Sequence, residues 1–280
     1  MPRARAANVL VVDDERLTRH LIRSVLTGAG YRVRLATDGA DAIARLRSET
    51  FDLVLLDVWM PRVDGMAVLD WLQGRKKSPS VIVLTSDEAP DTVLKAIQRR
   101  AHFFTRKPVV PNALVDIVQR ALKAGGQPPI DVVSAKQDWV ELSVPCTKEA
   151  ADRLHSVMAH LDADLPPEVR ESVGYAFREL LLNAVEWGGR LDPKRRVRIS
   201  YLRAKRMLLY RISDPGPGFK MDSLSHAAVT HPSDPIEHMN VREQKGLRPG
   251  GFGLLMVRAK VDELVYNEKQ NEVVFVKYLD

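Results

Sequence analysis

The sequence predicts two domains: an α/β domain on a five-stranded, parallel, doubly wound sheet, and an α+β domain with helices packed on an antiparallel sheet. Three observations predict this. The chain has 280 residues, enough for two domains that each bury a core. Short β-branched runs alternate with amphipathic stretches in the first half, whereas the second half groups helices and paired strands. A stretch containing Gly-Gly and Pro-Pro separates the halves.

Five apolar runs in the first half are the expected strands. They are NVLVVDD (8–14), YRVRLAT (31–37), FDLVLLDV (51–58), SVIVLTS (80–86) and AHFFTRK (101–107). Strands that alternate with helices form a parallel sheet covered on both faces. Such a sheet binds its ligand at the carboxyl ends of its strands.

Polar side chains stand at the carboxyl ends of these runs: Asp13, Asp14, Asp57, Thr85 with Ser86, and Lys107. Converging carboxylates repel one another unless a cation neutralises them, and oxygen ligands suit magnesium. A lysine and a hydroxyl beside them would complete a phosphoryl site, with Asp57 able to accept the group as an acyl phosphate. The alternative is that these carboxylates only cap helices, as Asp14 could. Five such positions at the correct strand ends favour the site.

These motifs make residues 8–124 resemble a receiver domain of a two-component response regulator. The matching stretches are VVDDE (11–15), LLDVWMPRVDG (55–65), LTSDE (84–88) and the Lys-Pro pair at 107–108. The resemblance implies that Asp57 is the phosphoacceptor and that Asp13, Asp14 and Asp57 bind magnesium. It also implies that Thr85 and Lys107 contact the phosphoryl group, that the rotamer of Phe104 reports the switch, and that a cognate histidine kinase is a partner.

The first half departs from the family pattern at two places. Arg100-Ala101 replaces the usual Gly-Ala before the fifth strand. Trp59 occupies a position beside the acceptor that in this family tunes dephosphorylation. The resemblance therefore predicts phosphorylation but leaves the lifetime of the phosphorylated state open.

The stretch KAGGQPPIDVVSAKQD (123–138) has no sustained helical period and is interpreted as a linker or a short connecting strand. The predicted domains are accordingly residues 1–124 and 138–280, joined by a linker over 125–137.

The second half is expected to form helices and an antiparallel sheet. Helices are predicted at 148–161, at about 167–187 and within 248–261. Strands are predicted at 139–145, 196–204, 206–214, around 262–267 and around 272–279. Helices on one antiparallel sheet make this domain α+β.

The stretch RELLLNAVEWGG (178–189) places two polar side chains inside an apolar helix. Glu179 and Asn183 are four residues apart, so they lie on one face and can reach a common small object such as a metal ion or a water. The Gly-Gly pair that follows ends the helix.

Two glycine-rich turns accompany this helix. In DPGPG (214–218), Asp214 projects from a strand end while Gly216 and Gly218 let the backbone pass close to a flat ligand. RPGGFG (248–253) opens directly into a helix, an arrangement that binds phosphate. Glycine-rich turns alone are commonly only turns. Together with Glu179 and Asn183 they predict a nucleotide site.

In order and spacing, residues 138–280 resemble the ATPase fold shared by gyrases and histidine kinases, and in particular its anti-sigma-factor serine kinase branch. The resemblance implies ATP and magnesium as cofactors, with Asn183 as a ligand of that magnesium. It implies that Glu179 positions or deprotonates the attacking hydroxyl and that Asp214 binds the adenine amino group. Gly250, Gly251 and Gly253 are expected to line the phosphate side.

Several residues depart from that branch. Trp187 stands where the branch often has histidine, and we interpret it as filling the core. The segment 222–247 is about twice as long as a tight lid and carries His226, His231 and His238. Because these histidines have no helical or paired spacing, a mobile nucleotide lid is favoured over a metal site. His155 and His160 lack a histidine-kinase dimerisation pattern and are interpreted as helix-surface or core residues.

Composition restricts the partners. The net charge of +6 comes from residues 1–124, which carry 20 basic and 14 acidic side chains. These charges are interspersed, which favours a solvated face over a nucleic-acid site. A lone cysteine, Cys146, and the lack of a signal-peptide core or a membrane-length apolar run predict a cytoplasmic protein.

The sequence therefore predicts a response regulator in a bacterial partner-switching pathway. Phosphorylation of Asp57 would control an ATP-binding serine/threonine kinase-like output that acts on an anti-sigma-factor antagonist or a sigma-factor-like regulatory protein. The alternative is a non-catalytic module that uses ATP only to shape a partner surface. Glu179 favours the kinase, because a scaffold needs no base. No nucleic acid or membrane partner is expected, and a homodimer is compatible with the sequence.

Overall fold

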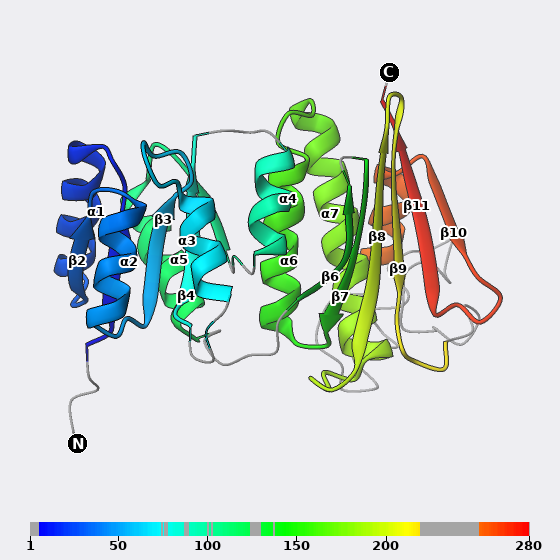
Figure 1. The fold of residues 1–280 in the computed structure, drawn as a ribbon. Coiled ribbons are helices and arrows are strands. Elements are labelled where there is room, and N and C mark those ends of the chain that lie inside the picture. Colours follow the sequence, from blue (N-terminus) through cyan, green and yellow to red (C-terminus); the bar gives the residue numbers. More distant parts are fainter. Residues whose placement is uncertain are drawn as a thin grey trace. The chain divides into compact units, whose positions relative to one another are not determined.

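The chain forms two compact units, residues 1–127 and 128–280, and each is described by itself (Figure 1). The computed structural model describes residues 6–73, 75, 78–86, 90–99, 101, 103–123, 130–136, 138–218 and 252–279. None of the helices within these ranges is long and apolar enough to cross a membrane.

The first unit is the predicted α/β domain. Its five strands form a parallel sheet in the order β2-β1-β3-β4-β5. The strands are β1 (Asn8–Val12), β2 (Arg32–Ala36), β3 (Leu53–Asp57), β4 (Ser80–Thr85) and β5 (Phe103–Arg106), and the helices are α1 (Arg16–Gly28), α2 (Gly39–Ser48), α3 (Gly65–Gln73), α4 (Pro90–Gln98) and α5 (Pro111–Lys123). The chain runs outward from β1 in both directions, which places a topological switch point between β1 and β3.

The core of this unit explains why its strands are continuous apolar runs. Every residue of β3 and β4 is buried, as a sheet covered on both faces requires. On one face, α1 and α5 pack on alternate residues of the central strands. Ile22 and Leu26 from α1 and Leu114 and Ile117 from α5 belong to this cluster. The buried strands fix the position of every residue that follows a strand end.

The second unit is the predicted α+β domain. Its sheet has six strands in the order β10-β11-β9-β8-β7-β6, all paired antiparallel. The strands are β6 (Asp131–Lys136), β7 (Trp139–Pro145), β8 (Arg196–Ala204), β9 (Met207–Ser213), β10 (Glu263–Tyr266) and β11 (Glu272–Tyr278), and the helices are α6 (Lys148–Leu161), α7 (Pro167–Asn183), the π-helical turn η1 (Ala184–Gly188) and α9 (Gly253–Lys260). Helices α6, α7 and α9 lie on one side of this sheet (Figure 1).

One segment left open by the sequence is now defined, and one helix differs from the expectation. Strand β6 lies inside the segment interpreted as a linker or a short connecting strand, and it pairs with β7 through a register that shifts between Val132 and Ser134. Residues 131–136 are therefore the edge strand of the second sheet. The limits of the two domains given from the sequence remain predictions. The helix expected to reach Trp187 is α-helical only to Asn183 and continues as η1.

A buried polar cluster ties α6 to the sheet of the second unit. Asp162 follows the last turn of α6 and accepts hydrogen bonds from the hydroxyls of Tyr201, at 3.0 Å, and Tyr210. Tyr210 is fully buried and stacks on Phe275 with ring centres 4.8 Å apart. Burial raises the pKa of Asp162 to about 6, although the two hydroxyls act in the opposite direction.

Candidate functional sites

The carboxylates predicted at the strand ends of the first unit come together. Asp13 and Asp14 follow β1, and Asp57 is the last residue of the neighbouring strand β3. One carboxylate oxygen from each of the three lies within 4.8 Å of the others. Asp13 and Asp57 are buried, whereas Asp14 is exposed. Asp14 is thus the carboxylate of this group that solvent reaches.

Lys107, which follows β5, completes this group. Its Nζ is 2.7 Å from Asp13 Oδ2 and 2.5 Å from Asp57 Oδ2. Burial raises the pKa of Asp57, and the lysine partly opposes that rise. Burial also acts to lower the pKa of Lys107, but the hydrogen bonds to Asp13 and Asp57 outweigh it and the pKa is raised. The three grouped carboxylates, two of which contact the Lys107 ammonium, are an oxygen donor set that suits a hard divalent cation such as Mg²⁺.

The remaining predicted residues of this site line the same edge or the sheet beneath it. Thr85 ends β4, is 2 % exposed, and its carbonyl accepts from the backbone N–H of Lys107 at 3.0 Å. Phe104 is buried on β5. The backbone N–H of Trp59 donates to Asp57 Oδ1 at 3.2 Å, while the Trp59 side chain is exposed.

Gly65 is a residue of this site that sequence reasoning did not single out, although it lies in the quoted acceptor motif. Its N–H donates to the Val58 carbonyl at 3.0 Å. A Cβ at this position would overlap the backbone carbonyl of Asp57. The glycine therefore allows the chain after the acceptor strand to pass directly beside Asp57.

The second predicted site begins on α7. Glu179 and Asn183 are both partly buried and lie one helical turn apart. Glu179 packs against Gly253, the first residue of α9, and a Cβ on Gly253 would overlap the Glu179 carboxylate. The structure thus brings a predicted catalytic residue and a predicted phosphate-side glycine into contact.

The π-helical turn η1, which continues α7, contacts Asp214. It follows Asn183 directly, and π-helical turns occur frequently at functional sites. A Cβ on Gly188 of η1 would overlap the Asp214 carboxyl group, so these two residues also touch. Gly188 was not singled out from the sequence except as part of the pair that ends the helix.

Asp214 follows β9 and is partly buried. Burial raises its pKa, and a hydrogen bond of 2.7 Å from the Gly216 N–H to Asp214 Oδ1 opposes the rise. Gly218 adopts φ +83, and a Cβ there would overlap the Lys269 carbonyl. Gly216 and Gly218 therefore allow close backbone approach, as predicted, although here the approach is to the carboxylate and to the β10–β11 turn.

Part of the predicted site lies outside the described residues. Gly250 and Gly251 are in this part, and so is the segment 222–247 with His226, His231 and His238. Within the described ranges, the phosphate side is represented by Gly253 alone.

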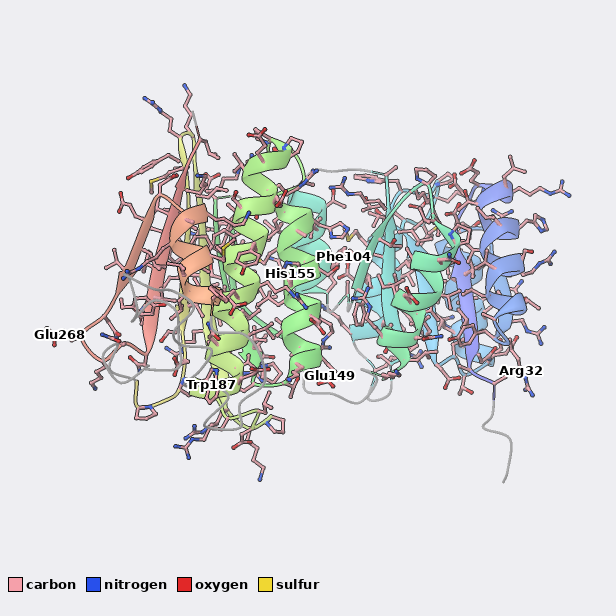
Figure 2. All side chains as sticks on the ribbon, turned by 180° about the vertical axis from the view of Figure 1, so that it is seen from behind. Arg32, Phe104, Glu149, His155, Trp187 and Glu268 are labelled. Carbon is pink, nitrogen blue, oxygen red and sulfur yellow. The ribbon has the colours of Figure 1, made fainter. Side chains whose placement is uncertain are left out.

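The interpretation of Trp187 as a core residue is wrong. Its side chain is 66 % exposed and lies at the margin of the second unit (Figure 2). The physical reason is η1: a π-helical turn holds more residues than an α-helical turn, so it changes which side chains face the sheet. Ala184 and Val185 are buried, and Trp187 faces outward.

The two histidines of α6 contact backbone carbonyls of helices α7 and α6. His155 Nε2 is 3.3 Å from the Gly174 carbonyl of α7, and burial lowers the pKa of this histidine. His160 Nδ1 is 2.7 Å from the Ser156 carbonyl, one turn earlier. These positions agree with helix residues that take part in packing.

Comparison with known protein families finds two matches. The response regulator receiver domain matches residues 9–119, and the histidine kinase-like ATPase domain matches residues 144–277. The first range contains the carboxylate site, and the second contains Glu179, Asn183 and Asp214.

Individual proteins match different shares of the chain. The DNA-binding response regulator MtrA of Mycobacterium leprae is 30% identical over 201 residues, which cover 70% of this chain and 88% of MtrA. The transcriptional regulatory protein ZraR of Salmonella typhimurium is 33% identical over 115 residues, which cover 41% of this chain and only 26% of ZraR. The crystal structure of NtrX from Brucella abortus has 34% identity and a TM-score of 0.41, and covers 43% of this chain and 27% of NtrX.

Proposed function

Because the chain belongs to the response regulator family and joins a receiver domain to a histidine kinase-like ATPase domain, we propose that a phosphoryl group on Asp57 controls an ATP-dependent protein kinase output. The output would phosphorylate a serine or threonine of an anti-sigma-factor antagonist or a sigma-factor-like regulatory protein. The observation that carries the proposal is the grouping of Asp13, Asp57 and Lys107 in one site, in a chain that also places Glu179 against Gly253.

In the receiver, we assign the phosphoacceptor role to Asp57. A carboxylate oxygen of Asp57 attacks the phosphorus of the phosphorylated cognate histidine kinase, an O–P bond forms, and the bond from phosphorus to the histidine nitrogen breaks. Asp13, Asp14 and Asp57 would hold Mg²⁺, which neutralises charge on the phosphoryl oxygens. Lys107 contacts the Asp57 oxygen, which supports a role in binding the transferred group together with the Thr85 hydroxyl at the neighbouring strand end.

In the ATPase domain, Asn183 would be a ligand of the nucleotide-bound Mg²⁺, and Asp214 would bind the adenine amino group. Gly216 and Gly218 would let the backbone pass close to the base, while Gly253, with Gly250 and Gly251, would line the phosphates. Glu179 would take the proton of the attacking hydroxyl. Its contact with the first residue of α9 supports this role, because a helix N-terminus attracts the phosphate that the hydroxyl must reach.

The names of MtrA and ZraR describe DNA binding and transcriptional regulation by those proteins. In this chain the domain that follows the receiver is the ATPase domain, and we therefore propose that output passes through ATP and protein contact. The second candidate is a non-catalytic module that binds a partner when ATP is bound. It would need Asn183 and Asp214 but not Glu179.

The experiment is incubation of the full chain with γ-labelled ATP and purified candidate antagonist proteins, with and without acetyl phosphate. Label on a partner serine or threonine that depends on acetyl phosphate supports the kinase. ATP-dependent partner binding without any label would contradict the kinase and support the binding module.

A further inference from the structure

The turn between β10 and β11 is built around two asparagines. Asn267 Oδ1 accepts from the backbone N–H groups of Asn271, at 3.1 Å, and Glu272, at 3.2 Å. Asn267 Nδ2 donates to Asn271 Oδ1 at 2.9 Å. The first two bonds hold the backbone of the turn, and the third holds the Asn271 side-chain amide by its oxygen, which leaves Asn271 Nδ2 to bond elsewhere.

Asn271 uses its remaining groups to hold the loop that carries Asp214. The Asn271 carbonyl accepts from the Asp214 N–H at 2.9 Å, and Asn271 Nδ2 donates to the Gly216 carbonyl at 3.2 Å. Within that loop, the Gly216 N–H donates to Asp214 Oδ1. Asn271 therefore hydrogen-bonds the backbone of Asp214 and of Gly216, two residues further on. Asp214 is the residue whose carboxylate is proposed to bind the base.

The contact between turn and loop has little freedom. Gln270 has φ 56, a left-handed conformation that costs free energy for a side chain other than glycine. Beside it, the Lys269 carbonyl leaves no space for a Cβ on Gly218. On the other side, Gly188 of η1 closes on the Asp214 carboxyl group. A shift of the turn would therefore move the carboxylate.

We propose that Asn271 is a positioning residue that sets the base selectivity of the nucleotide site by holding Asp214 in place. The inference rests on the proposed function, in which Asp214 meets the purine edge. An acceptor carboxylate favours adenine, whose 6-amino group donates, over hypoxanthine, whose 6-oxo group accepts. The preference for adenine depends on the position of the Asp214 carboxylate, which Asn271 determines. Binding of the triphosphate does not depend on that position.

The test measures dissociation constants for MgATP and MgITP with the full chain. For Asn271→Ala we expect the affinity for MgATP to fall about tenfold, as for loss of one well-placed hydrogen bond, with a change of less than about twofold for MgITP. Asn271→Asp, which keeps the shape and removes the donor to Gly216, should lower the ratio of the two affinities in the same direction.

Glu268→Ala is the matched control, because Glu268 is exposed at the tip of the same turn (Figure 2) and should leave both affinities unchanged. Asp214→Asn should abolish most of the selectivity, and adding Asn271→Ala to it should change the ratio no further if Asn271 acts through Asp214.

Equal losses for both nucleotides in the Asn271 variants, or no loss for either, would overturn this inference and leave the proposed function standing. A wild-type chain that binds neither nucleotide, or an Asp214→Asn variant with wild-type selectivity, would overturn the proposed nucleotide site and the inference together.

Discussion

The two sites of this protein are held in different ways. In the receiver domain, Asp13 and Asp57 sit at the ends of adjacent buried strands, and the spacing of about 4.8 Å between strands sets their separation. In the ATPase domain, the residues come from a helix face, a π-helical turn, a strand end and a β-turn, and the glycines Gly188 and Gly253 set their contacts. A sheet edge therefore assembles the first site, whereas close backbone approach assembles the second.

The comparison predicts that acceptance of a phosphoryl group at the first site depends on the Asp57 carboxylate alone. Asp57→Asn should abolish labelling of the chain by acetyl phosphate, because the amide removes both the nucleophile and one charge of the metal site. The neighbouring strand ends remain, so Asp13→Ala and Asp14→Ala should instead weaken the dependence on Mg²⁺. Undiminished acyl-phosphate labelling of Asp57→Asn would show that the phosphoryl group goes elsewhere.

The second site should divide its work between residues one turn apart. Asn183→Ala should reduce MgATP binding, because the proposed ligand of the nucleotide-bound Mg²⁺ is lost. Glu179→Ala should leave binding nearly intact and slow phosphoryl transfer about a hundredfold or more. Isothermal titration with MgATP and single-turnover transfer assays separate the two effects. If both variants lose MgATP binding equally, Asn183 and Glu179 do not have separate roles in nucleotide binding and in activation of the hydroxyl.

In the ATPase domain a buried carboxylate away from the proposed nucleotide site should titrate with folding. The pKa of Asp162 is raised by burial to about 6 in the folded chain, so the folded state binds this proton more tightly than the unfolded state does. Its contribution to stability is therefore present below pH about 4 and is lost between about 4 and 6, on the order of 3 kcal/mol. Asp162→Asn should remove this pH dependence from chemical denaturation of the second unit.

Asp164→Asn is the control for that measurement. Arg203 pairs with Asp164 at 2.8 Å and lowers its pKa, so this carboxylate stabilises at higher pH and the sign is opposite. An Asp162→Asn variant with the same pH profile as the wild type would show that Asp162 does not titrate in this range.

Backbone strain gives the smallest expected effect. Arg190 and Leu191, which follow η1, have φ 57 and 54, whereas in the described part of the receiver Arg62 alone among non-glycine residues has a positive φ. Leu191→Gly should stabilise the second unit by up to about 1 kcal/mol, because glycine adopts this conformation without steric cost. Arg190→Gly should act in the same direction. A lower denaturation midpoint in both variants would mean that their side chains contribute more than the strain costs.

The sequence predicts the first site better than the second, and the reason is physical. The order of buried strands brings Asp13, Asp57 and Lys107 together whatever the details of the loops. Packing of the second site depends on a π-helical turn that no apolar period reveals, so the outward position of Trp187 was missed. Asn271 is not predicted from the sequence because its bonds to Asp214 and Gly216 join segments more than 50 residues apart in the chain.

The strands and helices themselves follow the same division. Long periodic segments such as α6, predicted and observed at 148–161, were found from the sequence. For the segment that contains β6 the sequence leaves a linker and a short connecting strand open, because an edge strand next to Pro-Pro has no buried face to mark it with a clear alternation.

The central claim is that the phosphoryl group on Asp57 controls the nucleotide site. The most direct measurement is the MgATP affinity of the full chain with and without beryllofluoride as a phosphoryl mimic, repeated with Asp57→Asn and with the ATPase half alone. We predict a change of about tenfold in the full chain only, and by linkage an equal effect of MgATP on beryllofluoride affinity. Identical MgATP affinities in the full chain with and without the mimic would contradict the claim, even if each site binds its own ligand.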